Sequence, residues 1–523
     1  METDIKELQR LKDPEKPERK NKRDAARKQI RGSSLLLAGK LLSMIINFAS
    51  QVFIVRYLST TDYGAWAYAL SVVAFCQNLA VFGLDRGITR FIPIYHEKNE
   101  YNKLFGTLVL VFGSILLACG LIIAAFYMAP EQVARLIKDK DQPLTLLFIM
   151  ILLIPSEAMD LLLTGLFASF AKPRAIFFRK HLLGPLLRFG VVLLLMTFHS
   201  SVIFLAYGYL AASVLGVLIY SVLLFRLLQK EGFFQHLQLK AITIPAKEIF
   251  AFTLPLLSSD LVNILTHSAD TLLLGYFHDP TQVALYRVVL PAAHFNKLVM
   301  TSFGFLFTPL AARLLAKNDF QAINDLYWRT AVWIGVLSFP IFALTFSMAK
   351  PLTQFLYGER YIDSWVFLQL ISFGYYFSAA LGFNGLTLKV LGKLRYIVTI
   401  NIIAVIVNVG INLLLIPKYG ALGAAIGTSS TMVVHNIFKQ IGLRLTSGIS
   451  IFDKQYLPFY LIIAGSAAAL FLITLVFAEN IYIAVPLVAL ASIFVIRMSK
   501  DKLKVEETFP ELLKLPLMKW LLK

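Results

Sequence analysis

Polar and ionisable side chains follow one face of an otherwise apolar stretch between residues 247 and 277. The face is defined by the spacing i, i+3, i+7 and i+10, and its members are Asp260, Asn263, His267 and Asp270. An ionised side chain at the centre of a bilayer costs at least about 2.5 to 3.5 kcal/mol, so such residues should face a protein interior or a watery cavity. Asp260, His267 and Asp270 are therefore our candidates for ion coupling or charge pairing.

A second polar face follows on the next apolar stretch, which ends near residue 308. Its members are Arg287, Pro291, His294, Lys297 and Thr301. The two stretches are joined by a tight turn at Phe277-His278-Asp279-Pro280. Equal distances from this turn place Asp270 at the level of Arg287, and Asp260 at the level of Lys297. The hairpin therefore predicts two charge pairs, which either lock it or line a transport pathway.

Other cations interrupt the apolar runs of the first part of the chain. Arg188 lies deep in the run that begins near residue 175, and Lys40 lies about two turns into the first run. Arg179 and Lys180 lie closer to the end of their run, and we expect them to reach the inner membrane surface. We predict a substrate-binding cavity lined by Arg188, Lys297, Arg287, Lys40 and Asn47. Cations in a partly dry cavity replace the hydration of phosphate or pyrophosphate, although Asp260 and Asp270 would neutralise part of this charge.

The composition fits a protein that crosses a membrane many times. Hydrophobic residues make up 58% of the 523 positions and charged residues only 15%. The formal net charge of +19 would suggest nucleic acid in a soluble protein, but here it follows from basic loops on one side of the membrane. Cys76 and Cys119 both lie inside apolar runs, without metal-binding spacing. We therefore expect no nucleic-acid partner and no metal site.

Known catalytic motifs are absent from the sequence. There is no GxxxxGK[ST], HExxH or GxSxG pattern and no paired CxxC. No outer loop is much longer than about fifteen residues, which leaves little room for an external catalytic domain. We therefore predict a protein that is not an enzyme, that uses no cofactor, and that takes energy from an ion gradient, the membrane potential or the gradient of its substrate.

The order of the apolar runs predicts an all-α polytopic membrane protein with about fourteen transmembrane helices. They form two pseudo-symmetric six-helix bundles and a C-terminal helix pair. The predicted parts are a basic cytoplasmic arm that is disordered or lies on the membrane surface (1–32), the two bundles (33–230 and 245–445), the extra pair (455–498) and a basic amphipathic cytoplasmic tail (499–523). Lys and Arg concentrate in alternate loops, so both termini should face the cytoplasm.

The two bundles show a weak internal repeat. A shift of 220 residues maps the polar face of the hairpin onto the first apolar run, as Lys40, Ser43, Asn47 and Ser50. The same shift maps Leu193–Leu195 onto Leu413–Leu415, before the last span of each half. We interpret the small-residue run Gly423–Gly427 as helix packing without chemistry.

Several short patterns resemble one family of membrane proteins. The clearest pattern lies between residues 408 and 425. It consists of Asn408, Asn412, Leu413-Leu414-Leu415-Ile416-Pro417 and Tyr419-Gly420-Ala421-Leu422-Gly423-Ala424-Ala425. The others are Val55-Arg56-Tyr57-Leu58-Ser59, Asp62-Tyr63-Gly64, Gly83-Leu84 with Thr89-Arg90-Phe91, Leu254-Pro255, Ser268-Ala269-Asp270, Leu274-Gly275, Tyr357-Gly358 and Tyr361. Over most of residues 33–450 the chain resembles the polysaccharide-biosynthesis and O-antigen flippase branch of the multidrug/oligosaccharidyl-lipid/polysaccharide exporter superfamily.

The resemblance implies two bundles facing each other across a central cavity, and alternating access that passes a polyprenyl-pyrophosphate-linked oligosaccharide across the plasma membrane. Expected partners are this substrate, membrane lipid, and polysaccharide polymerase and glycosyltransferases. One alternative is an ion-coupled small-molecule exporter of the same fold, in which Asp260 or Asp270 is essential while Arg188 and Lys297 are not. A membrane glycosyltransferase or polymerase is a second alternative, which the short outer loops disfavour.

Overall fold

The chain was analysed as a computed structural model, which describes residues 15–135, 141–236, 238–449, 454–477, 480–508 and 514. Side chains of some helical residues, among them 15–30, 255–263 and 265–267, lie outside this description. Every regular element in the described part is a helix. The predicted all-α class is therefore confirmed.

Many of these helices are long and apolar enough to cross a bilayer. Ten qualify singly in the described part of the chain, and the number rises to twelve if each of two bent pairs is one span. Two further long helices are α12 (Ala246–Phe277) and α21 (Ala421–Ser447), with 32 and 27 residues. The chain is a multi-pass membrane protein, and the number fourteen stays a prediction.

The first half of the fold runs to residue 230. Its elements are α2 (Glu15–Tyr57), α3 (Thr60–Val81), α4 (Leu84–Glu97), α5 (Tyr101–Met128), α6 (Pro130–Arg135), α7 (Asp141–Ile151), α8 (Leu153–Ser169), α9 (Pro173–Ile176), the π-helix η1 (Phe177–Leu183), α10 (Gly184–Thr197) and α11 (Val202–Lys230). The short 3-10 helices η2 (Phe233–His236) and η3 (Leu239–Ala241) lead to the second half.

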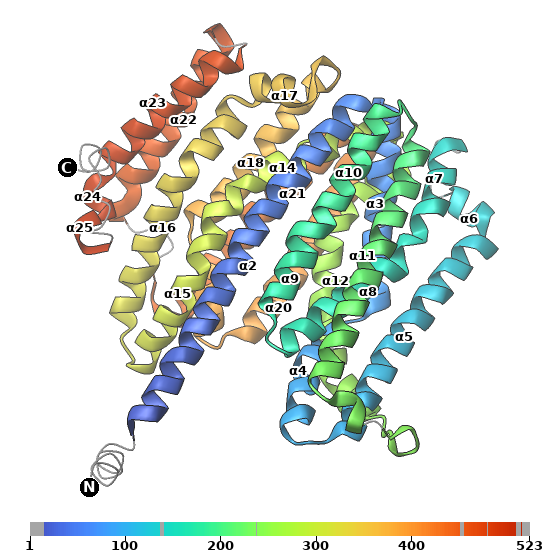
Figure 1. Cartoon of the computed structure of the whole chain (residues 1–523). Helices are drawn as coiled ribbons and strands as arrows, with labels where there is room; N and C mark the ends of the chain where they lie inside the picture. The colour runs from blue at the N-terminus through green and yellow to red at the C-terminus, as the bar shows by residue number, and fades with distance from the viewer. Residues whose placement is uncertain are drawn as a thin grey trace.

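The second half begins with α12 and ends with α21. Between them lie α13 (Pro280–Arg287), α14 (Leu290–His294), η4 (Phe295–Lys297), α15 (Leu298–Ala316), α16 (Phe320–Phe342), η5 (Ala343–Ser347), α17 (Ala349–Tyr357), η6 (Glu359–Ser364), α18 (Trp365–Ala380), α19 (Asn384–Val390) and α20 (Leu394–Tyr419). After η7 (Lys454–Tyr456) come the last long helices, α22 (Leu457–Phe477) and α23 (Ile481–Met498), and then the short α24 (Lys500–Leu503) and α25 (Val505–Thr508). The pair α22 and α23 lies beside α16 at one edge of the molecule, and α5 lies at the opposite edge (Figure 1).

The two halves repeat with a nearly constant offset. Second-half helices that begin at residues 280, 320, 394 and 421 correspond to first-half helices that begin at residues 60, 101, 173 and 202, which gives offsets of 219 to 221. The offset agrees with the repeat of 220 residues seen in the sequence. The fold therefore consists of pseudo-symmetric halves. A position in the first half can be compared with the position about 220 residues later in the second half.

The halves meet closely at the end of the bundle where α3 begins. A Cβ atom at Gly64 would overlap the carbonyl oxygen of Pro280, so the backbones of α3 and α13 touch there. Hydrogen bonds cross between the halves at the same end: Gln51 Nε2 donates to Val288 O at 3.1 Å, and Arg360 Nη1 donates to Leu58 O at 2.8 Å. One buried apolar cluster includes residues of both halves. This end of the interface is closed.

A second contact between the halves lies at the opposite end. Phe82 and Gly83 both adopt left-handed backbone conformations, which separate α4 from α3. From α4, Tyr95 Oη donates to Glu248 Oε2 of α12 at 2.7 Å, and the Arg90 guanidinium lies 4.1 Å from the centroid of the Phe252 ring. The interface is therefore held at both ends on the side formed by α3, α4 and α12.

The ends of the chain differ in part from expectation. Helix α2 begins at Glu15 and continues into the first span, so the described part of the predicted arm (1–32) is helical, and its place at the cytoplasmic side stays a prediction. The Ala, Arg, Lys and Glu residues of this segment have high helix propensity. At the other end, Leu503 is only 1% exposed and its carbonyl accepts a hydrogen bond of 3.1 Å from Trp333 Nε1 of α16. The start of the predicted surface tail therefore packs against the second half, while residues 509–513 and 515–523 lie outside the described part.

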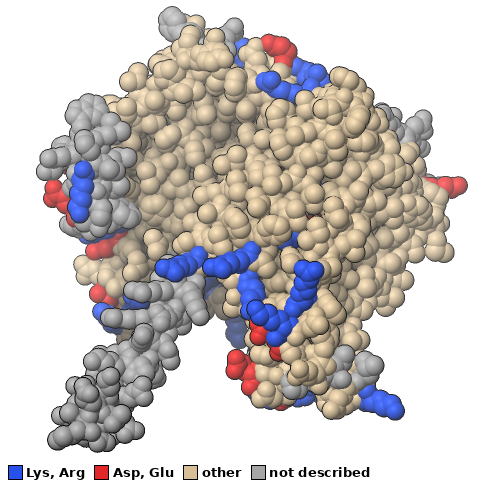
Figure 2. Space-filling view, in the orientation of Figure 1, with Lys and Arg blue, Asp and Glu red and all other residues tan. Residues whose placement is uncertain are grey.

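Charged side chains are unevenly distributed on the surface. Figure 2 shows a broad surface without charges across the visible face, and Lys and Arg side chains below it, near the end where α2 emerges. An uncharged band bordered by basic residues on one side is the pattern expected for a protein embedded in a bilayer.

Candidate functional site

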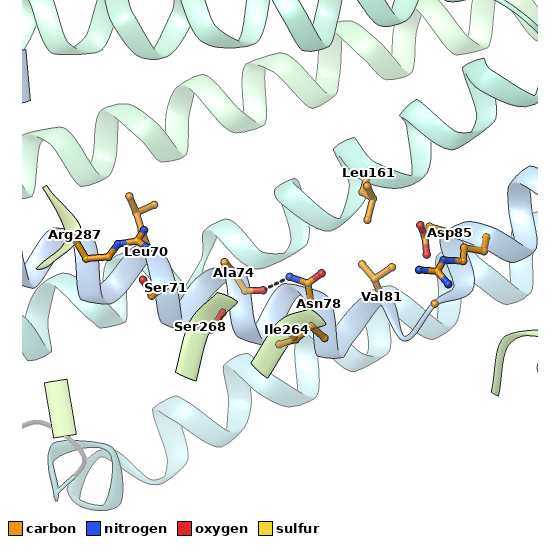
Figure 3. Close-up of a pocket in the computed structure, with 12 residues that line it drawn as sticks. Leu70, Ser71, Ala74, Asn78, Val81, Asp85, Leu161, Ile264, Ser268 and Arg287 are labelled. Carbon is orange, nitrogen blue, oxygen red and sulfur yellow. Dashed lines mark hydrogen bonds between the residues drawn. The ribbon is translucent and has the colours of Figure 1, made fainter. Parts of the chain in front are cut away.

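A central pocket of about 410 Å³ lies between the two halves. It is lined by residues of α3, α4 and α8 from the first half and of α12 and α13 from the second: Leu70, Ser71, Ala74, Asn78, Val81, Gly83, Asp85, Arg86, Leu161, Ile264, Ser268 and Arg287. Arg287 lies at one end of this pocket and Asp85 at the other, with Asn78 on α3 between them (Figure 3). The pocket is therefore polar at both ends.

Arg287 reaches the central pocket because the segment that carries it is broken. Helix α13 ends at Arg287, and α14 begins at Leu290 with Pro291 in its first turn, where the missing proline N–H is tolerated. Arg287 is half-buried and has no hydrogen-bond or ion-pair partner among the described side chains. A guanidinium without a fixed partner at the wall of a pocket is available for an anionic group.

A lateral pocket of about 480 Å³ lies between α2 and the segment from α14 to α15. It brings together three of the predicted substrate residues, Lys40, Asn47 and Lys297, and its remaining lining is largely apolar. Lys297 Nζ lies 4.2 Å from the centroid of the Tyr375 ring, which is a cation–π distance. Basic groups beside apolar walls suit a ligand with a charged head and a hydrocarbon tail.

Asp270 lies inside the second half, in a network of hydrogen bonds. Its side chain is only 4% exposed. Tyr286 Oη donates to Asp270 Oδ2 at 2.8 Å, and both Asn412 Nδ2 and Thr428 Oγ1 donate to the same carboxylate. The expected pairing of Asp270 with Arg287 was wrong, because Asp270 points toward α20 and α21 while Arg287 points into the central pocket.

The network around Asp270 contains an amide oxygen that accepts no hydrogen bond from the described residues. Asn412 is fully buried, and its Oδ1 atom has no hydrogen-bond partner among the described residues. Its Nδ2 atom also lies 3.3 Å from Asn408 Oδ1. A Cβ atom at Gly427 would overlap Asn412 Oδ1, so the glycine makes room for this oxygen. The run Gly423–Gly427 therefore serves the polar network as well as helix packing.

The other candidates on α12 are described only through their backbone. Asp260, Asn263 and His267 lie within this helix, and their side chains lie outside the described part of the structure. The predicted pair of Asp260 and Lys297 therefore stays a prediction.

Arg188 does not line either pocket. It forms an ion pair with Glu157 of α8, and Ser213 Oγ of α11 donates to the same Glu157 oxygen at 2.9 Å. The expectation that Arg179 reaches the membrane surface was wrong: its side chain pairs with Asp160 at 2.7 Å and donates to Gly216 O at 2.9 Å, and the residue is 5% exposed. Both arginines therefore point toward α8, Arg179 to Asp160 and Arg188 to Glu157.

Gly216 provides the space for the buried Arg179 side chain, since a Cβ atom there would overlap the guanidinium. We expect Gly216→Ala to separate Arg179 from Asp160 and to destabilise the protein by about 3–5 kcal/mol, the usual cost of breaking a buried ion pair. The measurement is thermal unfolding in detergent. Gly190→Ala is the matched control, because nothing lies within 4 Å of that position. Equal unfolding temperatures for the two variants would contradict the assignment.

Sequence reasoning missed Glu157, Tyr286 and Thr428. Glu157 carried a signal, because it is an acidic residue inside an apolar run, as Asp270 is. Tyr286 and Thr428 gave no such signal, because single hydroxyl groups are common in membrane helices.

Comparison with known proteins supports one class. The family model described as polysaccharide biosynthesis protein matches residues 30–294, and the MatE model matches residues 255–414. A solved structure of the lipid II flippase MurJ in an inward closed conformation covers 89% of this chain and 99% of its own, with 15% identity and a TM-score of 0.68. An inward-facing MATE family multidrug transporter covers 78% of this chain and 95% of its own, with 17% identity and a TM-score of 0.63.

Two sequence relatives show higher identity than these structures. An uncharacterized membrane protein of Methanocaldococcus jannaschii is 24% identical over 420 residues, which is 77% of this chain and 81% of the relative. The capsular polysaccharide biosynthesis protein CapF of Staphylococcus aureus is 26% identical over 181 residues, or 34% of this chain and 46% of the relative. Fold and family matches together define a polytopic membrane protein with the fold of the flippase MurJ and of MATE transporters. The chain belongs to the polysaccharide biosynthesis protein family, in agreement with the resemblance found in the sequence.

Proposed function

We propose that the protein moves a polyprenyl-pyrophosphate-linked oligosaccharide across the plasma membrane by alternating access, for the synthesis of surface polysaccharide. The observation that carries this proposal is the position of Arg287, a cation that has no partner among the described side chains and lies at the wall of a pocket formed by both halves. The family, the fold of MurJ and the relation to CapF support the substrate class.

The lateral pocket suits the entry of such a substrate. Lys40 and Lys297 offer positive charge to a pyrophosphate, while Leu37, Met44 and Phe48 on the same wall leave a path for a hydrocarbon chain. Gln51 lines this pocket and bonds to Val288, the neighbour of Arg287 in the chain. A head group could therefore pass from Lys40 and Lys297 to Arg287 when the contact between Gln51 and Val288 opens.

Asp270 is the candidate for ion coupling. A carboxylate buried without a basic partner among the described side chains is stable only if it is protonated or binds a cation. Asp260 and His267 stay candidates through their positions on the same helix. Exchange of an ion at α12 would bias the contacts of this helix with α3 and α4, and hence the state of the interface.

The proposal includes the orientation of the protein in the membrane and its partners. Both termini face the cytoplasm, so the interface between α3 and α13 lies toward the outside and Tyr95 lies toward the inside. Membrane lipid surrounds the apolar band, and polysaccharide polymerase and glycosyltransferases are the proteins that would use or supply the substrate. The chain performs no bond chemistry in this scheme.

Reconstitution in liposomes tests the proposal. We expect purified protein to move a lipid-pyrophosphate saccharide between leaflets without modifying it. Arg287→Gln and Lys297→Gln should each lower the initial rate about tenfold or more, because hydrogen bonds to charged groups contribute about 1.5–3 kcal/mol. Arg226→Gln, a substitution of an exposed arginine on α11, is the matched control and should leave the rate unchanged.

Other outcomes favour the alternatives. Unchanged rates in both pocket variants, together with loss of activity in Asp270→Asn, would favour an ion-coupled exporter of small molecules, which shares this fold. Formation of a new glycosidic bond in the liposomes would favour a glycosyltransferase or polymerase.

A further inference from the structure

Two acidic side chains, one in each half, accept hydrogen bonds from helices that correspond under the repeat. The acids themselves lie on helices that do not correspond, since Glu157 is on α8 and Asp270 is on α12. Asp270 accepts hydrogen bonds from Asn412 of α20 and Thr428 of α21. Glu157 accepts from Arg188 of α10 and Ser213 of α11. Because α10 and α11 correspond to α20 and α21 under the repeat, each half surrounds one carboxylate with side chains of the same two helices.

The two surroundings differ in one charge. Under the offset of 220 residues, Arg188 corresponds to Asn408, which lies next to Asn412 in the network of Asp270. The first half therefore holds a guanidinium where the second half holds an amide. Glu157 has a permanent cation beside it, whereas Asp270 has only neutral donors among the described side chains.

An acceptor atom without a donor lies near Asp270, the carboxylate that has no cation beside it among the described side chains. Asn412 Oδ1 is buried and lacks a partner in the part of the chain that the structure describes, and the glycine at position 427 leaves space beside it. Among the described side chains, the titratable groups near Asp270 are Tyr286, which donates to it, and Tyr375. The side chain of His267, one turn before Asp270 on α12, lies outside this description. Neither tyrosine is a cation, so in the described part the charge of Asp270 is left to a proton or to a cation from solution.

The other acidic residue on α8 is also neutralised within the first half. Asp160 lies one turn after Glu157 and pairs with Arg179 at 2.7 Å. Nine residues separate Arg179 from Arg188, which is two and a half turns of a regular α-helix and would point the two side chains in opposite directions. The π-helix η1 spans Phe177–Leu183, and its wider turns rotate Arg188 back toward α8.

We propose that Arg188 is a built-in counter-cation that replaces, in the first half, the exchangeable cation or proton that Asp270 needs in the second. Of the two carboxylates Glu157 and Asp270, Asp270 alone then exchanges a positive charge with solution during the transport cycle. The inference rests on the proposed coupling role of Asp270. It assigns Arg188 to charge compensation within the first half and not to contact with the substrate.

Thermal unfolding of the purified full-length protein in detergent tests this assignment without any substrate. Sodium chloride is compared with choline chloride at constant ionic strength, and each series is repeated between pH 6 and pH 8. The sodium series detects a metal cation, and the pH series detects a proton. We expect the wild-type unfolding temperature to rise with one of the two ligands, because a ligand that binds only the folded state stabilises it.

Variants distinguish a ligand bound at Asp270 in the second half from a ligand bound at Glu157 in the first half. Asp270→Asn should abolish the ligand-dependent rise. Adding Arg188→Gln to Asp270→Asn should restore a rise, because Glu157 then lacks its cation, and adding Glu157→Gln as well should remove it again. Asp270→Asn with Arg188→Lys, which keeps the charge, and Asp270→Asn with Arg226→Gln, which changes an exposed arginine, should show no rise.

Two results would overturn the inference: a rise that persists in Asp270→Asn, or a folded Asp270→Asn/Arg188→Gln protein that shows none. If the Asp270→Asn/Arg188→Gln protein does not fold, the Glu157→Gln/Arg188→Gln variant is compared with its two single variants, in all of which Asp270 is intact. The inference requires the double variant to be more stable than either single one, and additive losses would contradict it. Because no substrate is present, these results stand even if the protein proves not to move a pyrophosphate lipid.

Discussion

Asp270→Asn is expected to lower gradient-driven transport by about a hundredfold or more while leaving the protein folded. Asparagine keeps the size of the side chain and can still bond with Tyr286, Asn412 and Thr428, but it carries no negative charge for a proton or cation to neutralise. A neutral amide is also cheaper to bury than a carboxylate, so thermal stability should stay equal or rise. The measurement is the initial rate of translocation in proteoliposomes, with and without an imposed pH or sodium gradient.

Asp279→Asn is the matched control for this experiment. Asp279 lies on the same hairpin and caps α13, with its side chain accepting a hydrogen bond from the backbone N–H of Gln282 at 3.0 Å. Asparagine caps helices about as well as aspartate, so this change should have little effect. Gradient-driven rates that are equal in Asp270→Asn and the wild type would remove Asp270 from the coupling mechanism.

Gly64→Ala should prevent closure of the interface between α3 and α13. A single methyl group at this position would overlap the carbonyl oxygen of Pro280, which is backbone and cannot rotate away. Overpacking of this kind costs about 1–3 kcal/mol, which disfavours the closed state by about 5- to 150-fold. We expect transport to fall by a similar factor, because alternating access requires this end to close in each cycle.

The state of the interface can be measured with a reporter cysteine. Ser71 lines the central pocket and is buried in the closed state, and the natural Cys76 and Cys119 are also buried. Ser71→Cys should react faster with a membrane-impermeant maleimide, added from outside, when Gly64→Ala is present. Gly113→Ala on α5 is the control, since nothing lies within 4 Å of that position. Equal labelling in the two backgrounds would contradict a gate at Gly64.

The sequence by itself determined the helical class, most helix boundaries and the internal repeat. The turn between Phe277 and Pro280 is present as predicted, and most apolar runs begin within a few residues of the observed helices, although α2 begins much earlier, at Glu15. These features depend on local properties: apolar length, proline and aspartate at helix starts, and composition, all of which can be read along the chain. The depth of a residue in the membrane follows from the same information.

The tertiary structure alone decided which side chains meet. Asp270 and Arg287 share a level, yet Asp270 turns to Asn412 and Thr428 while Arg287 turns to the central pocket. Arg188 was predicted to line that cavity, but it pairs with Glu157. The physical reason is rotation: position along the chain sets the height of a side chain, whereas its direction depends on how each helix packs and on breaks such as η1 and the one after Arg287. A rotation of one residue, about 100°, is enough to exchange one partner for another.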